Sequence, residues 1–158
     1  MDKKTKANLA ITLAIATMAL VFYSSSFSYQ DQSLVSDIQT IFKTQPFVES
    51  LSKIQFYYAG KLISVPSLGY AQFIEFFVRK AAHVMIYCFM AYQWARGLQY
   101  YMKYKWTSYV LAFFIIALYA MTDEFHQGLT PGRTPLVQDV VLDSFGGLLG
   151  IIIARLKK

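Results

Sequence analysis

The sequence has 158 residues, of which 56% are hydrophobic and 15% are charged, and its formal net charge is +6 at pH 7. This length suits one domain, and so apolar a composition excludes an ordinary soluble domain and indicates a multi-pass membrane protein. The basic residues lie at the edges of apolar runs and not along one surface element, so the charge predicts membrane topology and not nucleic-acid binding. The single cysteine, Cys88, excludes a disulfide within the chain.

The first apolar stretch, Leu9–Tyr23, follows a basic start and predicts a membrane-spanning helix over about residues 7–24. A cleaved signal peptide has the same basic start and apolar middle, and Ser24–Ser28 would supply the small residues of a cleavage region. The length of the run and its aromatic end at Phe22 and Tyr23, which is typical of a membrane interface, favour the spanning helix.

A polar stretch over about residues 25–71 follows, and it contains no run long enough to span a bilayer. We therefore expect an external loop. Two apolar sets within the loop recur at helical spacing, which predicts short amphipathic helices that lie on the bilayer surface or cap the bundle. The first set is Leu34, Val35, Ile38, Ile41 and Phe42, and the second is Phe47, Leu51, Ile54 and Tyr58.

Three further apolar runs predict spans over about residues 72–95, 106–127 and 136–154. Lysine and arginine are concentrated at both termini and in the short connection from Arg96 to Lys105, and the positive-inside rule places these regions in the cytoplasm. The prediction is an all-α protein of the cell membrane, with one domain over residues 1–158, four transmembrane helices and both termini cytoplasmic.

A polar segment from Met121 to Asp143 lies where the third and fourth predicted spans meet the outer face. Ionisable groups at the ends of spans are unfavourable unless they pair, face water or do chemistry, so the segment predicts a functional site. Its polar side chains are Asp123, Glu124, His126, Gln127, Arg133, Asp139 and Asp143. The turn Pro131-Gly132 is expected to bring the guanidinium of Arg133 back over the other groups.

The second predicted span adds a polar stripe to the same region. Its members are spaced by four residues and therefore share one helix face: Glu75, Arg79, His83 and Tyr87. In the third span, Asp123, His126 and Gln127 share a face, and Glu124 points about 100° away. Three separate segments thus direct acids and bases toward one small region.

These motifs resemble the VanZ-like family of small multi-pass membrane proteins. The matching residues are Arg79-Lys80-x-x-His83-x-x-x-Tyr87, Asp123-Glu124-x-His126-Gln127, Pro131-Gly132-Arg133, Asp139-x-x-x-Asp143-x-x-Gly146-x-x-x-Gly150 and, at the end of the first span, Phe22-Tyr23-Ser24-Ser25. The resemblance covers nearly the whole chain. It implies an association with resistance to teicoplanin-type glycopeptide antibiotics in some members, and it does not assign a reaction.

Two groups of candidate residues follow. The candidate catalytic residues are His83, as acid–base or nucleophile, and Asp123 or Glu124, which would orient it. The candidate ligand-binding residues offer charge or hydrogen bonds to a head group: Arg79, Lys80, His126, Gln127, Arg133, Asp139 and Asp143. Arg79 and Arg133 together would clasp a phosphate, because a guanidinium presents a planar fork to oxygen pairs.

Structural roles are the alternative for these residues. Arg79 would form an ion pair with an acidic residue of the third span and so fix helix register. Lys80 would be an interfacial anchor, and His83 would be a packed histidine of the bundle. Asp139 and Asp143 would oppose the positive end of the fourth span.

A metal site is not predicted. Asp123 and His126 are three residues apart on one helix, an arrangement that metal-carboxylate bundles use in two copies, whereas this chain has one. The sequence assigns no cofactor.

Three functions remain open at this point. The first is a binding protein whose outer-leaflet polar pocket holds a lipid head group, a lipid-linked cell-wall precursor or an amphiphilic glycopeptide antibiotic. The second is a membrane-embedded enzyme that acts on a lipid-linked phosphate or another envelope substrate. The third is a structural or adaptor subunit whose polar cluster joins four helices. We expect membrane lipids and no nucleic acid as partners, and the sequence does not define an oligomeric state.

Overall fold

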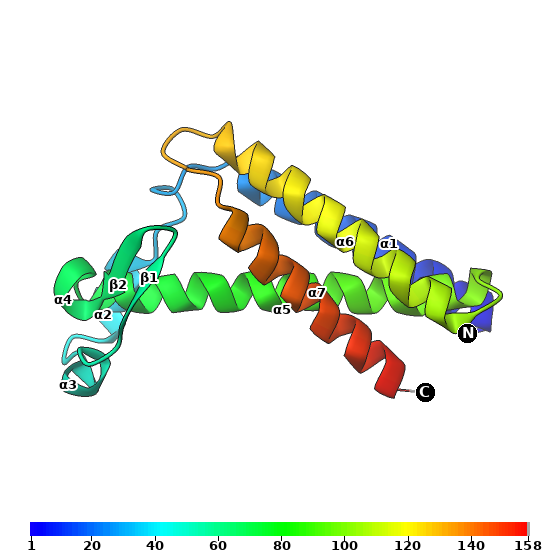
Figure 1. Cartoon of the computed structure of the whole chain (residues 1–158), viewed down its shortest axis with the longest axis horizontal. Coiled ribbons are helices and arrows are strands. Elements are labelled where there is room, and N and C mark those ends of the chain that lie inside the picture. Colours follow the sequence, from blue (N-terminus) through cyan, green and yellow to red (C-terminus); the bar gives the residue numbers. More distant parts are fainter. Residues whose placement is uncertain (158) are drawn as a thin grey trace. The chain divides into compact units, whose positions relative to one another are not determined.

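The computed structural model describes residues 1–157 and is mostly helical (Figure 1). The elements are α1 (Lys3–Ser25), α2 (Val35–Ile41), α3 (Val48–Leu51), β1 (Gln55–Tyr58), β2 (Lys61–Ser64), α4 (Val65–Leu68), α5 (Tyr70–Tyr101), α6 (Lys105–Gly128) and α7 (Val137–Leu156). They form two compact units. The first unit contains Met1–Ser28 and the chain from His83 onward, and the second contains Tyr29–Ala82, so each unit includes part of α5.

Three helices have the length and apolar composition to cross a membrane, namely α1, α6 and α7. They cover the first, third and fourth predicted spans. The helix α5 covers the second predicted span and continues in both directions, but it is not in this group, and its first half contains Glu75, Arg79 and Lys80. The four-span topology and the cytoplasmic termini therefore stay predictions.

Small residues bring the helices of the first unit close together, as they do at interfaces between membrane helices. The buried face of α1 contains Ala7, Ala10 and Ala14, and α6 buries Ala112 and Ala120 at helical spacing. Helices α1 and α6 lie side by side, and α7 contacts α6 (Figure 1). Larger buried side chains complete the core of this unit: Val21, Tyr87, Met90, Leu98, Ile116 and Ile151.

Two glycines of α7, Gly146 and Gly150, pack against another helix of the same chain. A Cβ atom on Gly146 would lie 2.6 Å from the carbonyl oxygen of Val84, and one on Gly150 would collide with the carbonyl oxygen of Cys88. The backbones of α5 and α7 therefore touch where the Gly-x-x-x-Gly spacing leaves room. This contact positions the polar residues at the start of α7 against α5.

The second unit contains a β-hairpin, which corrects the all-α prediction. Strands β1 and β2 pair antiparallel, with Tyr58 opposite Lys61, and the two residues between them have left-handed backbones, at φ 49° for Ala59 and 77° for Gly60. This is the usual geometry of a two-residue hairpin turn. The ring of Phe56 in β1 packs against the ring of Phe76 in α5.

The hairpin also shortens the second predicted loop helix. The apolar set ending in Tyr58 was expected to be helical, but α3 ends at Leu51 and Tyr58 lies in β1. The tight Ala59-Gly60 turn and the alternating exposure along β1 favour a strand over the helical spacing. The other loop helix, α2, buries Ile38 against Tyr70 and begins within the predicted range.

Candidate functional site

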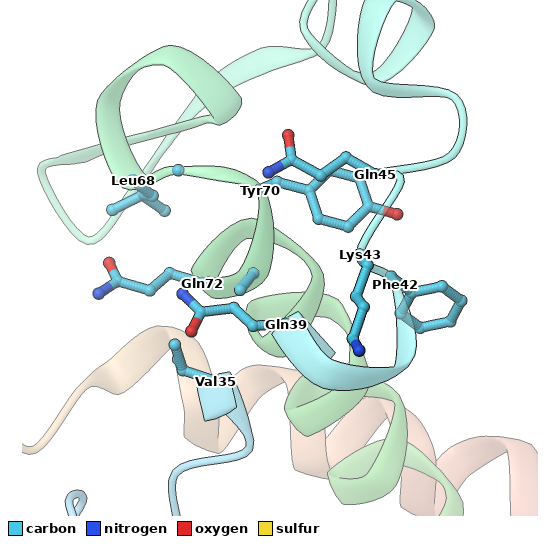
Figure 2. Close-up of a pocket in the computed structure, with 10 residues that line it drawn as sticks. Val35, Gln39, Phe42, Lys43, Gln45, Leu68, Tyr70 and Gln72 are labelled. Atoms are coloured by element: carbon cyan, nitrogen blue, oxygen red, sulfur yellow. The ribbon is translucent and has the colours of Figure 1, made fainter. Parts of the chain in front are cut away.

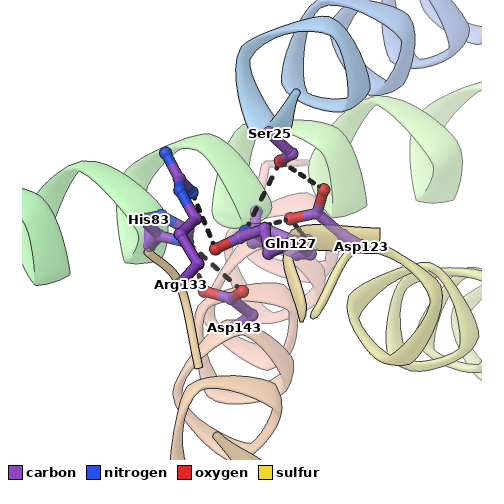
Figure 3. A network of polar contacts seen from close by, with 7 residues as sticks. Ser25, His83, Asp123, Gln127, Arg133 and Asp143 are labelled. Carbon is purple, nitrogen blue, oxygen red and sulfur yellow. Dashed lines mark hydrogen bonds and ion pairs between the residues drawn. The ribbon is translucent and has the colours of Figure 1, made fainter. Parts of the chain in front are cut away.

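The carboxylate of Asp123 is the centre of a buried hydrogen-bond network (Figure 3). The hydroxyl of Ser25 donates to its Oδ1 at 2.6 Å, and the amide of Gln127 and the hydroxyl of Tyr87 donate to its Oδ2 at 2.9 and 3.2 Å. Asp123 is only 1% exposed. A buried carboxylate is tolerated when hydrogen bonds replace its water, and this one accepts three from α1, α5 and α6.

Helix periodicity and a helix end explain this arrangement. Asp123 and Gln127 are four residues apart on α6 and therefore share a face. Ser25 is the last residue of α1, where backbone carbonyls lack helical partners, and the hydroxyl of Thr130 donates to its carbonyl oxygen at 3.0 Å. Tyr119 likewise donates to the carbonyl oxygen of Met18 at 2.6 Å, so α1 is joined to the end of α6 at two levels.

Arg133 extends the network toward the loop between α6 and α7. The loop turns at Gly132, whose φ of 78° suits a glycine, and Arg133 Nη1 then donates to Gln127 Oε1 at 2.9 Å. Because the Gln127 amide also donates to Asp123, it connects the guanidinium with the buried carboxylate. The predicted return of Arg133 over the cluster agrees with this geometry.

A second acid–base pair joins α5 and α7. His83 Nδ1 lies 3.3 Å from both carboxylate oxygens of Asp143. Asp143 is buried, with its side chain 2% exposed, whereas the His83 side chain is 34% exposed. The ring of His83 also stacks on that of Tyr87, with centroids 6.3 Å apart, and the hydroxyl of Tyr87 donates to Asp123. A carboxylate in this position accepts a hydrogen bond from an imidazole and orients the ring.

The structure thus brings five of the predicted site residues together at the ends of α6 and α7, from four separate segments. They are His83, Asp123, Gln127, Arg133 and Asp143, and we call them the polar cluster (Figure 3). The carboxylate that pairs with His83 is that of Asp143, and the orienting role of Asp123 or Glu124 stays a prediction.

Three other predicted site residues have different surroundings. Glu124 is buried and accepts the backbone N–H of Leu136 at 2.6 Å, which connects the end of α6 to the start of α7. His126 stacks on Phe22, with ring centroids 4.0 Å apart. Asp139 is half-buried in the first turn of α7, where a carboxylate opposes the positive helix end.

No group of three or more His, Cys, Asp or Glu side chains in residues 1–157 is placed to hold a metal ion. Asp123 and His126, whose spacing resembles that of metal ligands, have different surroundings. Asp123 accepts hydrogen bonds in the network, and His126 stacks on an aromatic ring.

Arg79 lies in the second unit and pairs with Glu75 of its own helix. Its Nη2 lies 3.1 Å from Glu75 Oε1 and 2.5 Å from the carbonyl oxygen of Gln32. The fully buried Glu75 carboxylate also accepts the backbone N–H of Leu34 and the hydroxyl of Tyr29, at 2.7 and 2.8 Å. Burial, and then the hydrogen bond to Glu75, raises the pKa of Tyr29. These contacts tether residues 29–34 to α5, and a joint action of Arg79 with Arg133 stays a prediction.

Lys80 also belongs to the second unit. Its Nζ lies 4.8 Å from the ring centroid of Tyr58 and 5.6 Å from that of Phe76, which is a cation–π geometry. This contact joins α5 to the hairpin and favours the structural role for Lys80.

Sequence reasoning missed Ser25, Thr130 and the importance of Glu75. Ser25 closes the motif at the end of the first span, and a small polar residue at the end of an apolar helix was the available signal. Glu75 was recognised on the polar stripe of α5, but the donors that surround it come from residues 29–34, which no helical period relates to it.

Comparison with known proteins gives the family. A family model described as VanZ/LLP1 matches residues 10–158. The chain belongs to the VanZ/LLP1 family. This confirms the resemblance drawn from the motifs, and every residue of the polar cluster lies within the matched region. No curated protein and no solved structure matches the chain. The family and the three apolar helices together identify this VanZ/LLP1 protein as a membrane protein.

Proposed function

We propose that this protein binds the phosphate-bearing head group of a membrane amphiphile at the polar cluster. The observation that carries the proposal is the pairing of two basic side chains with polar partners at the ends of spanning helices. Arg133 donates a hydrogen bond to Gln127, and the partly exposed His83 pairs with the buried carboxylate of Asp143. A guanidinium and a protonated imidazole both donate charge-assisted hydrogen bonds to phosphate oxygens.

The ligand class follows from the surroundings of the cluster. With four spans and both termini in the cytoplasm, the cluster faces the outer leaflet of the cell membrane, where lipids and lipid-linked cell-wall precursors present phosphates. An amphiphilic glycopeptide is the alternative occupant of the same site. Binding of either a precursor or the antibiotic would contribute to glycopeptide resistance of the teicoplanin type.

Asp123 has a positioning role in this proposal. Its carboxylate accepts three hydrogen bonds inside the protein and is almost fully buried, so its hydrogen-bonding capacity is directed to Ser25, Tyr87 and Gln127. Its role is to orient Gln127, whose side-chain oxygen accepts a hydrogen bond from Arg133 and so positions the guanidinium. Glu124, which accepts the N–H of Leu136, is assigned to the joint between α6 and α7.

Retention of lipid by the purified protein tests the proposal. Native mass spectrometry in mild detergent would compare the wild type with Arg133→Ala, after incubation with a long-chain phosphatidic acid. Hydrogen bonds to charged groups contribute about 1.5–3 kcal/mol, so we expect retention to weaken roughly 10- to 100-fold. Arg155→Ala is the matched control, because Arg155 is an exposed arginine in the last turn of α7. Equal retention by Arg133→Ala and the wild type would contradict the proposal.

The His83–Asp143 pair favours a second candidate, a membrane-embedded enzyme that acts on a lipid-linked phosphate. His83 would act as acid–base, Asp143 would orient it, and Arg133 would neutralise the phosphate. His83→Gln keeps a hydrogen-bonding side chain but cannot transfer a proton at neutral pH. An enzyme would lose turnover in this variant and keep its bound lipid, whereas no release of phosphate by the wild type would exclude hydrolysis of the lipid-linked phosphate.

A further inference from the structure

A cavity of about 370 Å³ lies in the second unit, between α2 and the start of α5 (Figure 2). This volume falls within the range of small-molecule sites, roughly 300–1,000 Å³. Its chemically distinctive lining side chains are Gln39, Phe42, Lys43, Gln45, Tyr70 and Gln72. All of them belong to residues 29–82, so the cavity is separate from the polar cluster.

The fold of this unit explains why the cavity is open. Ile38 on α2 is buried against Tyr70 and Ala71, and this contact holds α2 beside the first turn of α5. The hydroxyl of Tyr70 donates to the carbonyl oxygen of Pro46 at 3.2 Å and fixes the turn that follows α2. Gln45 in that turn has a left-handed backbone, at φ 47°, which is uncommon for a residue with a side chain. The turn thereby places Gln45 in the cavity wall.

The lining combines one positive charge with three carboxamides. Lys43 carries the only charge among the lining residues, all of which the structure describes. Within residues 1–157, no protein hydrogen bond or ion pair engages the side chains of Gln39, Lys43, Gln45 or Gln72. Figure 2 shows the amides of Gln39 and Gln72 on one side of the cavity and Lys43 on another. These groups are therefore available to a ligand.

We infer that this cavity binds a small anionic group that also carries hydroxyls, such as glycerol phosphate, either free or as the head group of phosphatidylglycerol. The ammonium of Lys43 binds the anionic oxygens. The carboxamides both donate and accept hydrogen bonds, as hydroxyl groups require. The rings of Phe42 and Tyr70 provide apolar surface for the carbon skeleton. The site uses none of the residues of the polar cluster, so it is independent of the proposed function.

Two probes distinguish the two sources of the ligand. Glycerol phosphate would be titrated into the full chain in phosphatidylcholine nanodiscs by isothermal calorimetry. Phosphatidylglycerol retention would be measured by native mass spectrometry in mild detergent. We expect saturable binding of at least one probe, and about tenfold weaker binding for Lys43→Gln, since hydrogen bonds to charged groups have that order of strength. Binding of the free probe alone identifies a soluble ligand, and retention of the lipid alone identifies a head group.

Three variants make the result specific. Lys53→Gln removes an exposed lysine of the same unit that does not line the cavity, and it should bind like the wild type. Because the polar cluster is itself proposed to bind phosphate, the variants are compared in an Arg133→Ala background, which removes that contribution. There, Gln39→Trp fills the cavity and keeps Lys43, and it should abolish the binding that remains. The inference is overturned if neither probe binds in this background, if Lys53→Gln weakens binding as much as Lys43→Gln, or if a folded Gln39→Trp variant still binds.

Discussion

Replacement of Asp123 by alanine should destabilise the helix bundle strongly. The substitution removes the acceptor of three hydrogen bonds, and the donors have different access to water. Gln127 is half-buried and can bind water, whereas Ser25 is 4% and Tyr87 0% exposed. A buried donor without a partner costs about 1–3 kcal/mol, so two of them should reduce the free energy of unfolding by about 2–6 kcal/mol. This exceeds the roughly 0.6 kcal/mol that one polar contact between membrane helices contributes on average.

Reversible unfolding in mixed micelles with increasing dodecyl sulfate, followed by far-ultraviolet circular dichroism, would measure this difference. The matched control is Asp37→Ala, which removes an exposed carboxylate from the first turn of α2 and should change stability by less than about 1 kcal/mol. Equal stability of Asp123→Ala and the wild type would refute the structural role of the network. If that variant were stable but had lost bound lipid, Asp123 would belong to the ligand site itself.

Three further predictions concern packing and the loop tether. Gly146→Ala should lower the free energy of unfolding by about 1–3 kcal/mol in the same assay, because its Cβ meets the backbone of Val84, whereas Ile152→Ala on the exposed face should change it little. Arg79→Ala should increase the rate of proteolysis within residues 29–34, and an unchanged rate would show that the tether does not order them. The raised pKa of Tyr29 means that its protonated form is stabilised in the folded state. Its contribution should be present below pH 10.0 and lost as the pH rises further, so Tyr29→Phe should remove this part of the pH dependence of unfolding.

Local patterns allowed the apolar helices to be predicted. Hydropathy over a window of about 20 residues indicates a spanning helix without any tertiary information, and α1, α6 and α7 follow it. The same approach was less informative for α5, which the structure extends to 32 residues and divides between two units. Apolar spacing predicted a helix that included Tyr58, and this was wrong, because a two-residue turn and strand pairing place Tyr58 in a β-hairpin.

Helix periodicity is enough to predict which face each ionisable residue occupies, because the 3.6-residue period relates positions such as Asp123 and Gln127 within one helix. The partners across helices depend on tertiary packing. His83 pairs with Asp143 because the glycines of α7 let its backbone touch α5, and Ser25 reaches Asp123 because α1 packs against α6. The structural alternative for Arg79 was an ion pair with Asp123 or Glu124 of another span, but Glu75 lies one turn away on its own helix and accepts the guanidinium there. Partner choice depends on which faces meet, and that is a property of packing and not of local periodicity.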